Sequence, residues 1–376
     1  MARLADVCEI LDSKRIPITA SDRIPGPYPY YGANGIQDYV ADYIFDDELI
    51  LLAEDGGNFG SKDKPIAYRV SGKCWVNNHA HVLKPRVGYD IDYVCYSLMY
   101  YDVTNLVNGA TRQKLTQADM REMIIPDRTL EEQKYIATLL DKLNGMISLR
   151  KRQLAKLDEQ VKARFVEMFG MPGTATTRWP IGTLGDCCIL NPKKSSDSRL
   201  TSGLTVSFVP MPAVSENGNI DVSEIREYDE VKTGFTYFAD NDVLFAKITP
   251  CMENGKGAVA QNLHNGIGFG STEFHVLRPI AGRSNPFWLY AITSFKQFRI
   301  DAEANMAGSA GQKRVPASYL ASYKISLPPI ILQEKFASFY KQVEKQMLTV
   351  QQSLDKLEVL KKSLMQEYFG RGSEMS

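Results

Sequence analysis

The chain has 376 residues, of which 44% are hydrophobic and 23% are charged, a composition typical of a folded globular protein rather than a disordered or fibrous one. This length exceeds one ordinary core and predicts two or three domains. Lysine plus arginine and aspartate plus glutamate both number 44, so the formal net charge is zero. That balance excludes a globally basic nucleic-acid binder but leaves local basic patches open.

The apolar runs and the cysteines indicate the cellular compartment of the protein. No apolar run approaches the roughly 18 residues that a membrane span needs. The six cysteines show no spacing typical of a disulfide framework. We therefore expect a cytoplasmic protein with reduced cysteines and no membrane partner.

The chain repeats itself once, with an offset of about 180 to 200 residues between matching segments. The segments keep the same order in both halves, as an internal duplication requires. The drift in the offset indicates that the halves differ by insertions. The matching pairs are Leu4–Cys8 with Leu184–Cys188, His81–Pro85 with His275–Pro279, Gly109–Lys114 with Gly308–Lys313, and Phe169–Gly170 with Phe369–Gly370.

The first part of each half predicts strands and one helix. Tyr28–Pro85 and Val206–Pro279 are rich in Tyr, Phe, Val, Ile and Gly, which is typical of short strands joined by turns. Asp90–Tyr101 and Pro286–Phe298 each predict one surface helix. The expected fold class is α/β of the mixed α+β kind, with one such globular domain in each half, followed by one long helix.

The last third of each half carries a heptad pattern. Apolar residues recur at spacings of four and three over more than four heptads, which predicts a coiled coil. Arg150, Arg164 and Lys361 interrupt the pattern, and their long stems can lie along the seam. The predicted seam positions are Ile136, Leu140, Leu143, Ile147, Leu154, Leu157, Val161, Phe336, Tyr340, Val343, Met347, Val350, Leu354, Leu357 and Leu364.

Connectivity predicts how the two helices pair. The second globular domain lies between the end of the first helix and the start of the second, and a compact domain keeps both of its ends within reach. The helices are therefore expected to pair antiparallel, which gives one chain an approximate two-fold symmetry. The predicted division is 1–130 for the first globular domain, 131–170 for the first helix, 171–330 for the second globular domain and 331–376 for the second helix.

Local basic patches point to DNA. The stretches 103–118 and 304–333 contain no acidic residue and occupy the same place in each half, directly before the long helix. Backbone amides of such a loop can hold phosphates while Gln and Arg side chains reach base edges. A second candidate is the loop 247–256, where Gly255 and Gly257 are expected to let the backbone approach a groove. An ordinary solvated loop is the alternative for both. The candidate DNA-binding residues are Arg112, Gln113, Lys114, Lys247, Asn254, Lys256, Gln312, Lys313 and Arg314.

A metal site is the less favoured interpretation of the H-x-H pair formed by His79 and His81. Alternation along a strand puts both rings on one face. No third ligand is evident, however, and we interpret both as hydrogen-bonded strand residues. We therefore predict no metal ligand in the chain.

A nuclease centre is also not favoured. The nearest match to the usual carboxylate pattern is Pro126 and Asp127 followed by Glu131 and Glu132. These residues stand at the start of a predicted helix, where acids cap the first turn and interact favourably with the helix dipole. The chain is expected to carry no catalytic residues and to be no enzyme.

The order of domain, helix, domain, helix, together with Phe245–Gly257 and the proline followed by Glu and Gln before both helices, resembles the DNA-specificity subunit of Type I restriction–modification systems. The resemblance covers nearly the whole chain. It implies two target recognition domains that each read half of a split site on double-stranded DNA. The first half departs from the pattern, because Leu52–Gly60 lacks the Thr-Pro-Cys core.

The resemblance also implies the partners. Two methyltransferase subunits would bind the helices, whose outer faces include 150–152, and motor-nuclease subunits would join them. S-adenosylmethionine, ATP and Mg would be bound by these partners, with no cofactor on this chain. The alternative function is a coiled-coil interaction scaffold without DNA sequence specificity, whose charged outer faces are merely solvated.

Overall fold

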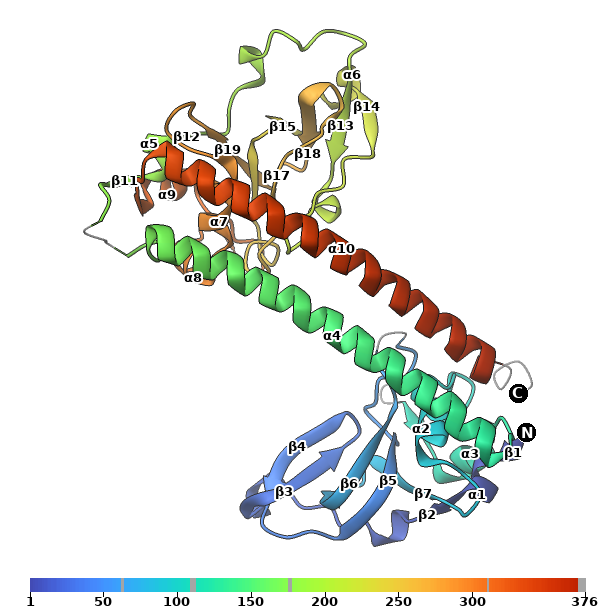
Figure 1. Cartoon of the computed structure of the whole chain (residues 1–376). Helices are drawn as coiled ribbons and strands as arrows, with labels where there is room; N and C mark the ends of the chain where they lie inside the picture. Colours follow the sequence, from blue (N-terminus) through green and yellow to red (C-terminus); the bar gives the residue numbers. More distant parts are fainter. Residues whose placement is uncertain (62–63, 109–112, 175–177, 310, 371–376) are drawn as a thin grey trace. The chain divides into compact units, whose positions relative to one another are not determined.

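The computed structural model describes residues 1–61, 64–108, 113–174, 178–309 and 311–370 (Figure 1). The chain folds into two compact units. The first unit is Met1–Lys151 with Gln352–Ser376, and the second unit is Arg152–Gln351. Each long helix therefore contributes to both units, and the four-part division made from the sequence stays a prediction. Within the described residues, no helix is both long enough and apolar enough to cross a membrane.

A six-stranded sheet forms the core of the first unit. Its strand order is β2-β7-β5-β6-β3-β4, with β3 and β6 parallel and the other neighbours antiparallel. Side chains alternate between the faces of the sheet: Ile50 and Leu52 pack with Tyr93 of a helix on one face, and Leu49 and Leu51 pack in a separate cluster. The strands are Cys8–Ile10 (β2), Pro25–Gly32 (β3), Gly35–Val40 (β4), Phe45–Ala53 (β5), Ala67–Val76 (β6) and Ala80–Pro85 (β7).

Short elements complete the first unit. Two further pairs of strands are antiparallel, β1 with β10 and β8 with β9. Asp90 caps α2 by accepting hydrogen bonds from the backbone amides of Asp92 and Tyr93, as expected of an N-cap aspartate. The elements are β1 (Ala2–Arg3), α1 (Leu4–Val7), α2 (Ile91–Met99), β8 (Val107–Asn108), β9 (Lys114–Leu115), α3 (Gln117–Arg121) and β10 (Ile124–Ile125).

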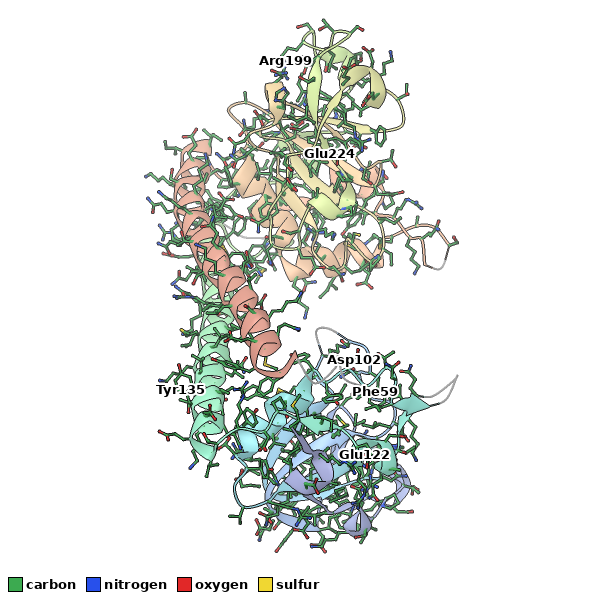
Figure 2. The ribbon with its side chains drawn as sticks, turned by 90° about the vertical axis from the view of Figure 1, so that its right-hand side faces the viewer. Phe59, Asp102, Glu122, Tyr135, Arg199 and Glu224 are labelled. Carbon is green, nitrogen blue, oxygen red and sulfur yellow. The ribbon has the colours of Figure 1, made fainter. Side chains whose placement is uncertain are left out.

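The second unit contains two four-stranded sheets of order β12-β19-β16-β17 and β14-β13-β18-β15. On its surface Arg199 and Glu224 are ion-paired, with Asp197 and Arg226 respectively (Figure 2). The strands are Ile181–Thr183 (β11), Cys188–Leu190 (β12), Thr205–Val209 (β13), Ile225–Glu227 (β14), Thr236–Ala239 (β15), Val243–Ala246 (β16), Gly257–Val259 (β17), Ile267–Gly270 (β18), Phe274–Pro279 (β19) and Lys324–Ser326 (β20, paired with β11). The helices are Leu184–Cys187 (α5), Tyr228–Val231 (α6), Pro286–Ser294 (α7), Lys296–Ala304 (α8) and Ala317–Ser322 (α9).

The internal duplication predicted from the sequence is present in the backbone. The elements β1, α1, β2, β5, β7, α2, α3 and β10 of the first unit recur as β11, α5, β12, β16, β19, α7, α9 and β20 of the second. Even the register is shared, because Leu52 pairs with His81 as Phe245 pairs with His275. The mixed α/β class predicted for each half is confirmed.

The prediction that α2 and α7 lie on the surface is wrong. Six of the nine residues of α2 and seven of the nine residues of α7 are buried. Each helix lies between a sheet and a long helix: Tyr96 of α2 donates its hydroxyl to Asp141 at 2.6 Å, and the ring of Phe287 of α7 lies 5.2 Å from that of Tyr340. The predicted segment 286–298 is also two helices, because Phe295 is extended between α7 and α8.

Two 40-residue helices, α4 (Leu130–Phe169) and α10 (Ile330–Phe369), start 200 positions apart. At 1.5 Å per residue each is about 60 Å long. Glu132 accepts hydrogen bonds from the backbone and side chain of Thr129, and Thr129 in turn accepts from the amide of Glu132. This capping box confirms that Glu132, one of the acids considered for a nuclease centre, serves as a helix cap.

A buried glutamine joins each long helix to its globular domain. Gln133 accepts a hydrogen bond from the amide of Asp90 at 2.8 Å and donates to the carbonyls of Gly88 and Arg128. Gln333 makes the same contacts with Asn285, Arg283 and Pro328. Both side chains are buried. The amide thus satisfies backbone groups at the start of the long helix and at the N-cap of α2 or α7.

Contacts inside each unit show that the two helices pair antiparallel (Figure 1). In the second unit the end of α4 meets the start of α10, and the rings of Phe165 and Phe336 lie 5.4 Å apart. In the first unit the start of α4 meets the end of α10, where Ile136 shares a cluster with Leu364. The outer side of α4 is exposed, as at Tyr135, which is 65% exposed (Figure 2).

The predicted seam positions differ in how deeply they are buried. Phe165 and Phe169 are buried one position after the heptad positions 164 and 168, because a straight helix drifts from a strict heptad. Ten predicted positions are buried, namely Ile136, Leu140, Leu143, Ile147, Leu157, Val161, Phe336, Val343, Val350 and Leu354. Leu154, Tyr340, Met347, Leu357 and Leu364 are half-buried.

Substitution of Leu354 tests the helix pairing. Leu354 is 5% exposed, so Leu354→Asp places an unpaired carboxylate in the seam and is expected to destabilise the protein by about 3–5 kcal/mol. Leu348, on the same helix, is 55% exposed, and Leu348→Asp is expected to melt within a degree or two of the original chain. Thermal unfolding followed by circular dichroism measures both, and equal melting of the two variants would contradict the pairing.

Candidate functional site

In the second unit the two candidate loops meet at the end of strand β16. The amide of Val315 donates to the carbonyl of Lys247 at 2.9 Å, and the amide of Thr249 donates to the carbonyl of Lys313 at 3.1 Å. The loop that follows β16 and the stretch before α9 are therefore hydrogen-bonded side by side. The sequence offered them as separate candidates, and the fold joins them into one surface.

The loop from Ala307 to Arg314 is a closed hairpin. The two residues exchange backbone hydrogen bonds of 2.9 and 2.8 Å. Gly308 has a φ of +127°, and a Cβ there would lie 2.8 Å from the carbonyl oxygen of Gln312, so only glycine fits at this position. Gln312 and Lys313 are exposed in the hairpin.

Arg314 is engaged by an acid. Its guanidinium donates two hydrogen bonds to Glu273, from Nε to Oε2 at 2.9 Å and from Nη2 to Oε1 at 2.8 Å. These hydrogen bonds outweigh partial burial and hold the pKa of Glu273 below its ordinary value. The pair uses Nε and Nη2, and Nη1 donates to the carbonyl of Gln312 at 3.1 Å, so Arg314 is held in place by the loop. Gln312 and Lys313 are the more exposed neighbours.

The candidates of the 247–256 loop differ in exposure. Lys247 is half-buried, and burial lowers its pKa even though Glu273 lies near. Lys256 is also half-buried and donates to the carbonyl of Met211 at 3.4 Å. Asn254 is exposed. Of these three residues, Asn254 is the one whose side chain is most accessible to a ligand.

The expectation that Gly257 lets a groove approach is wrong. A Cβ at Gly257 would lie 2.8 Å from the carbonyl oxygen of Leu244, which pairs with the same strand. The missing side chain serves the close packing of β17 against β16. Gly255 has a φ of +87°, which the turn itself requires.

A buried arginine that the sequence analysis missed holds this loop. Arg299 of α8 donates to the carbonyls of Thr293, Met252 and Gly255 at 2.5, 3.0 and 3.3 Å, and its guanidinium lies 4.5 Å from the ring centre of Phe245. Burial lowers the pKa of Arg299 to about 10. The side chain fixes the turn that carries Asn254.

The first unit repeats the arrangement with different side chains. The amide of Leu115 donates to the carbonyl of Glu54 at 2.8 Å, which matches Val315 and Lys247 of the second unit. Lys114 is therefore equivalent to Arg314 and not to Lys313, one position away from the alignment made on sequence. Lys114 is ion-paired with Glu54 at 2.9 Å.

The remaining residues of the first loop are only partly described. Gln113 is exposed. Arg112 lies outside the described residues, as does most of the predicted segment 109–114. The sequence could have indicated Glu273, because it stands two positions before His275 as His79 stands before His81.

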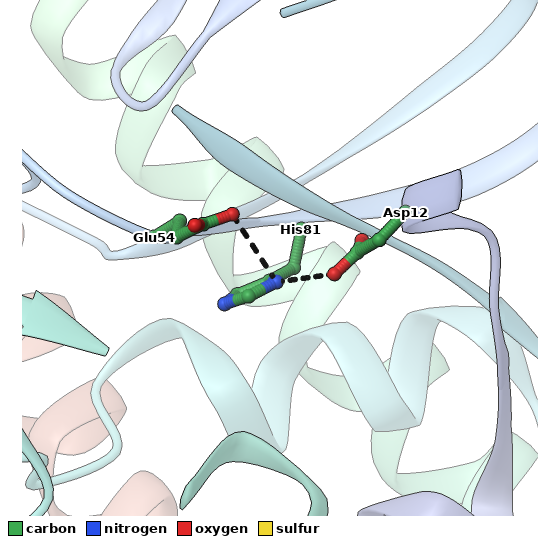
Figure 3. A group of neighbouring side chains, drawn as sticks. All are labelled: Asp12, Glu54 and His81. Carbon is green, nitrogen blue, oxygen red and sulfur yellow. Dashed lines mark hydrogen bonds and ion pairs between the residues drawn. The ribbon is translucent and has the colours of Figure 1, made fainter. Parts of the chain in front are cut away.

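Asp12, Glu54 and His81 lie together in the first unit (Figure 3). One potential ligand atom from each lies within 4.8 Å of the others. Arg15 contacts Glu54 at 2.5 Å and Asp12 at 3.5 Å, and Lys114 binds the second oxygen of Glu54. Because Arg15 and Lys114 already bind the two carboxylates and both ring nitrogens of His81 face hydrogen-bond partners, we assign the group to an ion-pair network and not to a metal centre.

The two histidines of the H-x-H pair do not share a ligand. His79 precedes β7 and contacts Asp55 at 2.6 Å, while His81 is buried and contacts Asp12 at 2.6 Å. The interpretation of both as hydrogen-bonded residues is confirmed. The partners of His81 come from positions far apart in the sequence, so alternation alone did not identify them.

Comparison with known proteins gives consistent matches. A family model described as the type I restriction modification DNA specificity domain matches residues 1–159 and 177–359. The chain is 38% identical to the type I restriction enzyme EcoEI specificity subunit of Escherichia coli over 197 residues, which are 50% of the chain and 32% of that protein. It is 36% identical over 145 residues to a putative type I restriction enzyme specificity subunit of Haemophilus influenzae, covering 39% of the chain and 37% of that protein.

The fold has a solved counterpart. The type I restriction–modification S subunit from M. genitalium superposes with a TM-score of 0.60 at 13% sequence identity, covering 98% of this chain and 95% of that one. At this identity the likeness concerns the fold. The matches to the curated relatives span less than two-fifths of the length of those proteins.

The ion pair of Glu273 predicts a pH-dependent stability difference. Because its pKa in the folded chain lies below the ordinary 4.5, the ionised carboxylate stabilises the protein above that value, and this stabilisation is lost as the pH falls through the lowered pKa. Glu273→Gln is therefore expected to lower the melting temperature at pH 7 and to approach the original chain near pH 3. Glu227→Gln is the control, because Glu227 is exposed. A difference in melting temperature between Glu273→Gln and the original chain that is constant with pH would contradict the ion pair.

Proposed function

The chain belongs to the type I restriction modification DNA specificity domain family, and we propose that it recognises double-stranded DNA in a sequence-specific way. One recognition surface lies in each unit. In the second unit it consists of the 307–314 hairpin and the turn that follows β16, and in the first unit of the equivalent segments around Gln113 and Leu52–Gly60. The curated relatives are specificity subunits, which supports this proposal.

The observation that carries the proposal is the presentation of exposed polar side chains from the same place in both units. Gln312, Lys313 and Asn254 are exposed in one unit and Gln113 in the other. Glutamine and asparagine pair with adenine in the major groove, and lysine pairs with guanine. The acids Glu54 and Glu273 hold the neighbouring cationic side chains, which keeps the exposed amides available for base edges.

A DNA site with two separated parts follows from two such surfaces on one chain. Each unit reads about three to five base pairs, and the paired helices set the spacing. Contacts from one side of the duplex require centres about one helical turn, or 10 base pairs, apart. An unread spacer of about 5–8 base pairs then separates two half-sites of unrelated sequence.

Catalysis is assigned to partner proteins. Two methyltransferase subunits would bind the helices and transfer a methyl group from S-adenosylmethionine to a base flipped out of the duplex, and a motor-nuclease subunit would use ATP and Mg²⁺. This chain would supply recognition alone. The cationic side chains that already bind both carboxylates of the Asp12 network argue against metal chemistry there, and six free cysteines fit a reducing cytoplasm.

A binding selection on randomised duplexes tests the bipartite site. The boundary between the two units falls after Lys151 in α4 and after Gln351 in α10. Four residues inserted after each of these positions add about one turn, or 6 Å, to both helices. We expect the original chain to select two half-sites with a fixed spacer, and the lengthened chain to select the same half-sites with a spacer longer by one or two base pairs. A continuous site, or a spacer indifferent to the insertion, would rule out the helices as the ruler. Equal binding to all duplexes would instead indicate a scaffold.

The absence of catalysis is tested separately. The purified chain is incubated with labelled S-adenosylmethionine, or with ATP and Mg²⁺, and a duplex that carries the selected site. We expect neither methyl transfer nor cleavage above a DNA-only blank, because the reacting groups belong to the partners. Turnover that co-purifies with the chain and is lost on substitution of one of its residues would overturn the non-enzyme assignment.

A further inference from the structure

The ring of His81 faces hydrogen-bond acceptors on both sides. Nδ1 lies 2.6 Å from Oδ2 of Asp12, and Nε2 lies 3.0 Å from the carbonyl oxygen of Leu115. A carbonyl oxygen can only accept. Asp12 also acts as an acceptor, because the amide of Val82 donates to Oδ1 at 2.8 Å and Gln117 donates to Oδ2 at 3.0 Å. Because the pKa of Asp12 lies below its ordinary value, its carboxylate is ionised at neutral pH and can only accept, so both ring nitrogens carry a proton.

The charges around His81 agree with this assignment. Burial by itself would raise the pKa of Asp12, but its hydrogen bonds, first of all that from His81, outweigh burial, and the pKa lies below the ordinary value. Glu54 lies 3.6 Å from Nδ1, and its carboxylate is in turn bound by Arg15 and Lys114. An ionised Asp12 in direct contact favours a charged imidazolium.

The equivalent histidine of the second unit has a different partner. Nε2 of His275 donates to the carbonyl of Val315 at 2.8 Å, and Nδ1 lies 3.1 Å from Nδ2 of Asn191. Oδ1 of Asn191 lies 3.4 Å from Nδ1, but it accepts the amide of Val276 at 3.0 Å, so the nearer NH₂ group is the one that hydrogen-bonds the ring. Nδ1 then accepts a hydrogen bond, and His275 is neutral. Burial lowers the pKa of His275, in agreement with the neutral form.

Both rings hold the same peptide of the candidate recognition loop. Leu115 and Val315 directly follow Lys114 and Arg314, and each offers its carbonyl to the histidine and its amide to the end of β5 or β16. The closing residue of each loop is thus fixed from two sides. Loss of the Nε2 donor would free the carbonyl and leave this peptide held on its amide side alone.

We propose that His81 and His275 are positioning residues for the two DNA-reading loops, and that they work in different charge states, His81 as an imidazolium on Asp12 and His275 as a neutral ring on Asn191. The role in DNA reading rests on the proposed function. The charge states rest on the hydrogen-bond geometry and on the ionised state of Asp12, and not on the proposed function.

Nitrogen NMR of the histidine rings tests the charge states. The chain has four histidines, so single substitutions assign every signal. At neutral pH we expect the two nitrogens of His81 to have the shifts of a doubly protonated ring, and those of His275 to have the shifts of the Nε2–H tautomer. Asp12→Asn reproduces the second unit's chemistry and is expected to convert His81 to the neutral pattern. A neutral His81 in the original chain would overturn the assignment.

Half-site discrimination tests the positioning role. A mismatch within a half-site costs about 1–3 kcal/mol, roughly 5- to 150-fold in affinity. We expect His81→Leu to reduce discrimination in one half-site to about twofold or less and to leave the other half-site unchanged. His275→Leu is expected to do the reverse. Asp12→Asn keeps the Nε2 donor and is expected to retain discrimination, as is the control His264→Leu, since His264 is exposed.

The outcomes separate the two proposals. Folded His81→Leu and His275→Leu chains that discriminate as the original does would overturn the positioning role. If the original chain prefers no duplex, the DNA proposal fails, while the ring signals still decide the charge states. Where a leucine variant does not fold, Asp12→Asn still identifies the His81 signals, so the charge states are decided on the unsubstituted chain.

Discussion

The buried side chains of Gln133 and Gln333 are the constraint on which the rest of the molecule depends. Each amide hydrogen-bonds the turn before α2 or α7 and the first turn of a long helix, so the helix leaves its globular domain in one fixed direction. A buried amide that lost these partners would cost free energy, because its donors and acceptor cannot reach water. With both directions fixed, α4 and α10 bury their apolar faces against each other inside each unit.

The two recognition surfaces use one backbone with different side chains. Glu54 of the first unit occupies the position of Lys247 in the second, and His79 occupies that of Glu273. Asp12 binds the histidine and the strand amide in the first unit, and Asn191 makes these contacts in the second. The hydrogen bonds that hold the loops are made mainly by main-chain groups and by the equivalent histidines His81 and His275. The loop chemistry can therefore differ between the units without altering the scaffold, as two unrelated half-sites would require.

Sequence reasoning succeeded where one residue pattern controls one element. The heptad spacing of α4 and α10 and the constant offset of 200 residues predicted two long paired helices, because helix periodicity is a local property. It failed where partners come from distant segments. It did not identify the ion pair of Arg314 with Glu273, 41 positions earlier, and the DNA contact of Arg314 stays a prediction. Arg299 was not identified at all, since nothing local distinguishes a buried arginine that binds three carbonyls. Phe165 and Phe169 were missed because the strict heptad ignores the drift of a straight helix.

Site-specific photo-crosslinking tests most directly whether each unit reads its own part of the DNA. A photoreactive side chain is placed at Gln113 in one preparation and at Gln312 in another, since both are exposed in equivalent loops, and each is bound to a duplex carrying the selected site. The account predicts crosslinks from position 113 to one half-site and from position 312 to the other, with both suppressed on scrambled DNA. Crosslinks from both positions to the same half-site, or equal crosslinking to scrambled DNA, would contradict it.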